Sequence, residues 1–121
     1  MGAGFGESFK TVNINGNNTY SKRMIIQCIL NDILQNDNIS NNVYKSPDGD
    51  ITSGKLSEIE FQEDMNNYID KLESNKEVFK VTKNGNKQIV EFEVEKVLNA
   101  LGYSSHMGVG IRHGIQKIEL N

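Results

Sequence analysis

A chain of 121 residues with 36% hydrophobic residues is the size of one ordinary domain with a modest core. Its formal charge of −3 disfavours a broad electropositive face for duplex nucleic acid. The sequence has one cysteine, no apolar run near the roughly 18 residues of a membrane span, and no basic and apolar leader, so it predicts a cytoplasmic protein that does not contact a membrane.

The first 18 residues are rich in glycine and asparagine, and they predict an arm that precedes a single domain over 19–121. Residues 8–14 alternate loosely between apolar and polar side chains, as in a short strand. The asparagines that follow it favour turns, because asparagine tolerates left-handed backbone. We therefore expect one short strand in the arm.

A long helix is predicted over about 20–35, where apolar residues recur at three- and four-residue spacings. Thr19 or Ser21 is the expected N-cap. The apolar stripe is wide, which indicates that more than one neighbour covers this helix. We expect it to be the central helix of the domain.

The second helix, predicted over 57–74, has a sharper start. Ser57 and Glu60 have the spacing of a capping box, in which each side chain bonds the other residue's backbone N–H. Leu56, before the cap, can pack on Phe61 as a hydrophobic staple. The sequence therefore places the start of this helix at Ser57.

Two β-prone runs over 77–92 surround Asn84-Gly85, a dipeptide that favours a tight hairpin turn. A third helix is predicted over 93–101, and a last strand over 114–120. The expected fold is therefore α+β, with about three helices packed on a small antiparallel sheet made of the 77–92 hairpin and the C-terminal strand.

The stretch SSHMGVGIRHG, at 104–114, holds three glycines, both histidines and one arginine. Successive backbone N–H groups at glycines can converge on an anion, and an arginine can add a forked grip on phosphate. A connecting loop whose glycines only form turns is the commoner alternative. Together with the N-terminal glycines, a site for a phosphate-bearing ligand would comprise Gly4, Gly6, His106, Gly108, Gly110, Arg112 and His113.

The same loop carries the alternative of catalysis. His106, Arg112 and His113 are residue types that a small metal-independent nuclease or toxin-like enzyme uses for acid–base chemistry and for charge stabilisation. Two histidines in a loop are more often ordinary polar surface, so an enzyme is the less favoured prediction. No cofactor and no metal site is predicted; the stretch at 46–52 resembles a calcium loop without its essential carboxylates.

The outer face of the 57–74 helix is acidic, and Glu60, Glu63, Asp64 and Asp70 are its expected partner-binding residues. Such a face is usually only solvated, but it can also mimic nucleic acid and occupy a basic groove on a protein. The sixteen asparagines are typical of AT-rich coding and favour a phage or mobile-element origin. We therefore predict a small non-enzymatic binding protein that inhibits or sequesters a host defence component through a basic protein partner or a phosphate-bearing ligand, with homo-oligomerisation left open.

Overall fold

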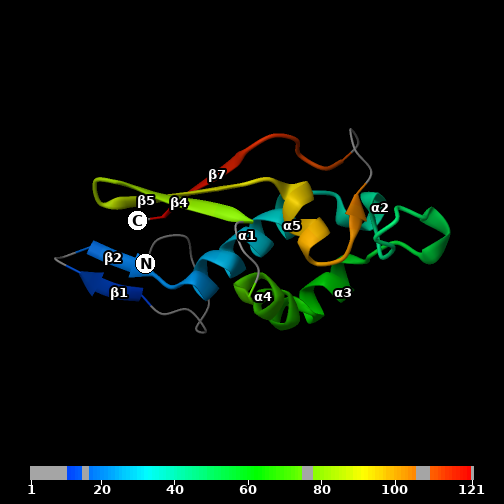
Figure 1. Ribbon diagram of the computed structural model, residues 1–121, viewed down its shortest axis with the longest axis horizontal. Helices are drawn as coiled ribbons and strands as arrows, with labels where there is room; N and C mark the ends of the chain where they lie inside the picture. The colour runs from blue at the N-terminus through cyan, green and yellow to red at the C-terminus, as the bar shows by residue number, and fades with distance from the viewer. Residues whose placement is uncertain (1–10, 15–16, 75–77, 106–109, 121) are drawn as a thin grey trace.

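The computed structural model describes residues 11–14, 17–74, 78–105 and 110–120, without the side chains of residues 11–19 and 53. It confirms the expected α+β fold. The helices lie on one side of a three-stranded antiparallel sheet (Figure 1). One continuous core of apolar side chains joins the sheet and the helices.

The sheet has the order β4-β5-β7, built from β4 (Phe79–Asn84), β5 (Lys87–Phe92) and β7 (Gln116–Leu120). Asn84 pairs with Lys87, so the central turn residues are Gly85 and Asn86, one position later than the expected dipeptide. Gly85 has φ 65°, which suits glycine at the first central position of the turn. Val90 and Phe92 are buried against the helices, as strand alternation requires.

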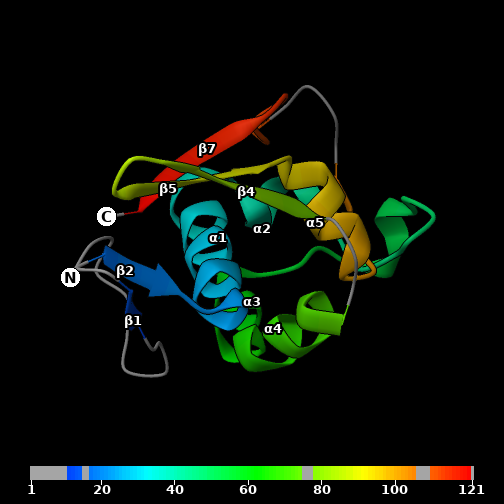
Figure 2. The same ribbon diagram turned by 60° about the vertical axis from the view of Figure 1, so that its left-hand side comes forward.

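Helix α1 (Lys22–Asn36) is the central helix, as expected. It lies between the sheet and the pair formed by α3 (Glu58–Glu63) and α4 (Met65–Ser74) (Figure 2). Its N-cap is Ser21, whose side chain accepts a hydrogen bond from the Met24 backbone N–H at 3.2 Å. Seven of its residues are buried, in keeping with the wide apolar stripe. Helix α5 (Val94–Ala100) follows β5 almost directly.

The second predicted helix begins where expected but is divided in two. Both hydrogen bonds of the Ser57–Glu60 capping box are present, with Ser57 Oγ 3.0 Å from the Glu60 nitrogen. Asp64, with φ −93° and ψ 9°, separates α3 (Glu58–Glu63) from α4 (Met65–Ser74). Both segments bury their apolar residues in the same core.

Several short elements were not expected from the sequence. A hairpin of β1 (Thr11–Ile14) and β2 (Asn17–Tyr20) precedes α1, and β1 covers part of the strand expected at 8–14; residues 8–10 lie outside the described part of the chain. A two-residue ladder joins β3 (Val43–Tyr44) to β6 (Ser104–Ser105). These elements are β1 (Thr11–Ile14), β2 (Asn17–Tyr20), α2 (Ile39–Asn42), β3 (Val43–Tyr44), the 3-10 turn η2 (Ile51–Ser53) and β6 (Ser104–Ser105). Within the described ranges, no helix is long and apolar enough to cross a membrane.

Candidate functional site

Arg112, expected to grip an anion, is held by two aspartates of the central helix region. Its Nη2 lies 2.8 Å from Oδ2 of Asp37 and 2.6 Å from Oδ2 of Asp32. The backbone N–H of Arg112 also donates to Oδ1 of Asp37 at 2.7 Å. The Asp37 side chain is 0% exposed, so the guanidinium compensates a buried carboxylate.

The charge in this cluster of Asp32, Asp37 and Arg112 does not favour a further anion. Burial lowers the pKa of Arg112, but its hydrogen bonds with Asp37 and Asp32 outweigh burial and leave that pKa raised. Arg112 therefore stays protonated at every ordinary pH. Two carboxylates face one guanidinium, and the main chemical effect of the cluster is to attach the segment before β7 to the end of α1.

Packing explains one of the three glycines of the 104–114 stretch, Gly110. Its φ of 72° is in the left-handed region, and a Cβ at this position would overlap the side-chain amide of Asn42. The Gly110 carbonyl accepts a hydrogen bond from the Asn38 backbone N–H at 2.9 Å. The buried Asn42 amide in turn donates to the Asn38 carbonyl at 2.9 Å. The glycine is therefore required for close backbone approach.

The structure brings together only part of the predicted ligand set. Gly110, Arg112 and His113 lie within one short segment, with His113 exposed and its carbonyl bonded to the side chain of Gln116 at 3.0 Å. The remaining predicted ligand residues, Gly4, Gly6, His106 and Gly108, lie outside the described residues. The proposed catalytic trio is described only at Arg112 and His113. No group of three or more histidine, cysteine, aspartate or glutamate residues among the described ones could hold a metal ion.

Two groups that could act as nucleophiles are buried instead. Burial raises the pKa of Cys28 to about 12, with a smaller effect from the charge of Asp32. The hydroxyls of Tyr68 and Tyr103 lie 2.8 Å apart and bond each other. Burial, followed by this hydrogen bond, raises the pKa of Tyr68 above its usual value. A protonated, buried thiol or phenol is a poor nucleophile.

The predicted partner-binding residues divide into paired and unpaired carboxylates. Glu60 lies 2.6 Å from Nζ of Lys45, and Asp70 lies 2.7 Å from Nη1 of Arg23. Glu63 and Asp64 are exposed and form no ion pair with any described residue. We call the carboxylates of residues 58–74 the acidic helix surface; they are the exposed Glu58, Glu63, Asp64, Asp70 and Glu73 and the half-buried Glu60.

An apolar residue that the sequence analysis did not single out lies within this surface. Ile59 is 69% exposed and precedes Glu63 by one helical turn. Residues four apart on a helix are neighbours on one face. Ile59 therefore offers an apolar contact beside a carboxylate that has no ion pair among the described residues.

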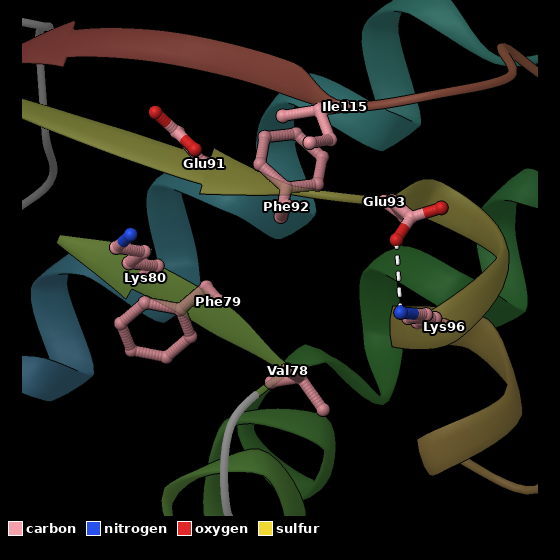
Figure 3. Close-up of a pocket in the computed structure, with 8 residues that line it drawn as sticks. All are labelled: Val78, Phe79, Lys80, Glu91, Phe92, Glu93, Lys96 and Ile115. Atoms are coloured by element: carbon pink, nitrogen blue, oxygen red, sulfur yellow. Dashed lines mark ion pairs between the residues drawn. The ribbon is translucent and has the colours of Figure 1, made fainter.

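A hollow of about 430 Å³ lies at the end of the sheet, where β5 leads into α5 (Figure 3). Phe79 of β4 and Phe92 of β5 are register partners at this end, and Ile115, 61% exposed, adds apolar surface beside Phe92. Glu93 and Lys96 form an ion pair of 2.9 Å at its side. The hollow is lined by Val78, Phe79, Lys80, Glu91, Phe92, Glu93, Lys96 and Ile115. Sequence reasoning missed it because its residues come from four segments.

Comparison with known protein families, characterised proteins and solved structures gave no match to this chain. The geometry of the described residues therefore carries the functional argument.

Proposed function

We propose that this protein is a non-enzymatic binding protein whose acidic helix surface binds a basic surface on a protein partner. The observation that carries the proposal is the division among its carboxylates: Glu63 and Asp64 are exposed and form no ion pair with any described residue, whereas Glu60 and Asp70 have lysine and arginine partners. Unpaired exposed carboxylates are the groups that a basic partner can neutralise at the lowest desolvation cost.

Local charge supports the same proposal. Residues 58–74 contain six carboxylates and one lysine, a local charge of −5, although the whole chain carries only −3. Such an electrostatic field speeds the association with a positively charged surface. Added salt screens the field and slows this association. The exposed Ile59 would supply the desolvated contact that charge alone does not provide.

The phosphate-ligand alternative is less well supported because its principal donor is already engaged. The guanidinium of Arg112 would have to leave Asp37, and that step would expose a buried carboxylate to an incoming anion of the same sign.

A partner that uses its basic groove to hold nucleic acid would be inhibited when the acidic helix surface occupies that groove. Inhibition of a host component by this route, as part of a phage or mobile element, is the form of the proposal that we favour.

A charge-reversal series tests the proposal. Glu63→Lys removes one unpaired carboxylate of the acidic helix surface, while Asp48→Lys is a matched reversal at an exposed turn elsewhere. Partners captured from a lysate would be purified, and their association rates measured at several salt concentrations. We expect Glu63→Lys to slow association by about tenfold at low salt and Asp48→Lys by less than about twofold.

The results that contradict the proposal are equally specific. Equal effects of the two reversals would show that only net charge matters. Partner binding that is insensitive to both salt and Glu63→Lys would place the interface elsewhere. Reproducible nucleolytic turnover by the purified protein would instead favour the enzymatic alternative.

A further inference from the structure

We infer that the open edge of β4 is a second binding site, which takes an extended acidic peptide segment as a fourth strand of the sheet. The inference is independent of the acidic helix surface, since the sheet and the pair α3–α4 lie on opposite sides of α1 (Figure 2). It rests on the backbone groups at the edge, on the charge of β4, and on the apolar hollow at its first residues.

The hairpin register determines which backbone groups face outward. Asn84 and Lys87 flank a two-residue turn, so they form a hydrogen-bonded pair. Because hydrogen-bonded and non-bonded pairs alternate, Phe79, Val81 and Lys83 direct their N–H and C=O groups away from β5. Of the described strands, only β5 is hydrogen-bonded to β4. These outward groups therefore offer a template for another strand.

The charge of β4 determines which kind of peptide strand can pair with it. β4 contains Lys80 and Lys83 and no carboxylate, and both lysines are exposed without an ion pair to any described residue. Antiparallel pairing with a second copy of β4 would bring lysines close together, which disfavours self-pairing. A peptide with glutamate or aspartate opposite these lysines would gain cross-strand attraction.

The charged side chains at the other edge of the sheet form ion pairs, whereas Lys80 forms none with a described residue although it is in register with Glu91. On β7, Glu119 lies 3.0 Å from Nζ of Lys87, and Lys117 lies 4.0 Å from the carboxylate of Glu91. Charges at that edge are already balanced within the sheet. The β4 edge is therefore the one that discriminates by charge.

The hollow supplies apolar contact at the first residues of β4. Figure 3 shows Val78, Phe79 and Lys80 on the β4 side of the hollow. An apolar side chain opposite Phe79 would pack on its half-buried ring at the rim of the hollow. The favoured partner is therefore an extended segment that combines acidic residues with one large apolar residue.

The probe for this site is the capped peptide acetyl-TETVEF-amide. In antiparallel register with β4, its two glutamates lie opposite Lys83 and Lys80, and its phenylalanine lies opposite Phe79. The controls are acetyl-TKTVKF-amide, which reverses the charge, and a form of the first peptide that is N-methylated at the amides facing β4. Binding is followed by NMR titration and amide hydrogen exchange.

We expect saturable binding of the acidic peptide and at least about tenfold weaker binding of both controls. The amide protons of Val81 and Lys83 should exchange at least about tenfold more slowly in the bound protein. The double reversal Lys80→Glu with Lys83→Glu should invert the preference between the two charged peptides. The matched reversal Lys55→Glu with Lys71→Glu should leave the preference unchanged.

Four results would overturn the inference. The acidic peptide fails to bind at millimolar concentration; the N-methylated peptide binds equally well; or slowed exchange is found away from β4. The fourth is a dimer in sedimentation whose Val81 and Lys83 amide protons already exchange slowly without peptide. A second copy of the protein would then occupy the β4 edge. None of these results bears on partner binding by the acidic helix surface.

Discussion

Replacing Arg112 by alanine tests whether its guanidinium is structural. The change leaves the Asp37 carboxylate buried without its cation, and loss of one partner from a buried ion pair costs about 3–5 kcal/mol. Two features favour the lower end of that range: the Arg112 side chain is 29% exposed, and the backbone N–H at position 112 still donates to Asp37. We therefore expect Arg112→Ala to lower the free energy of unfolding by about 3 kcal/mol and Tm by roughly 10 °C.

The order of three variants sharpens this prediction. Asp37→Asn keeps an acceptor and leaves Arg112 with Asp32, so it should cost less than Arg112→Ala. Asp32→Ala removes a partner that is 25% exposed and should cost about 1 kcal/mol or less. Urea unfolding followed by circular dichroism gives the three free energies. A loss below about 1 kcal/mol for Arg112→Ala, with a thermal shift by inorganic phosphate that this variant abolishes, would refute the structural role and support an anion site.

Three further predictions concern the cap, a glycine and the thiol. Ser57→Ala should lower the free energy of unfolding by about 1 kcal/mol in urea, whereas Ser74→Ala, which removes only side-chain donation to helix carbonyls, should be nearly neutral. Gly110→Ala should lower Tm more than Gly114→Ala, because both have positive φ but only Gly110 lies against another side chain. Burial raises the pKa of Cys28 to about 12, so above about pH 9 the thiol ionises in the unfolded chain but not yet in the folded protein. The free energy of unfolding should therefore fall between about pH 9 and 12. The fall measured over this pH range should be smaller in the Cys28→Ala variant.

Features determined by neighbouring residues could be predicted from the sequence. The capping box at Ser57, the tight turn next to Asn84 and the apolar spacing of α1 each depend on residues within one or two turns of one another. The break at Asp64 could not be predicted, because the apolar periodicity continues across it and the chain departs from helical geometry at that one residue only. The two-residue ladder of β3 and β6 is too short to leave a pattern.

The role of Arg112 was hidden because its partners are 75 and 80 residues away in the sequence. One local signal was available. Asp37 follows the last residue of α1, and a carboxylate at a helix C-terminus faces the negative end of the helix dipole. A buried aspartate at that position requires a cation from elsewhere in the chain, and Arg112 is one of only two arginines. The glycines drew attention to the loop, but Gly110 is explained by its approach to Asn42.

Acidic and basic side chains lie on separate surfaces of the protein, although the net charge is only −3. This separation determines which partner each surface can bind. Glu63 and Asp64, which form no ion pair with a described residue, lie on the acidic helix surface, while Lys80 and Lys83, likewise without an ion pair in the described part of the chain, lie on the edge of the sheet. A low net charge therefore excludes neither a cationic nor an anionic partner, because binding responds to the local potential within about a Debye length of the contact. Salt weakens both proposed interactions and cannot separate them. Charge reversal can, since Glu63→Lys should impair only the basic partner and Lys80→Glu only the acidic peptide.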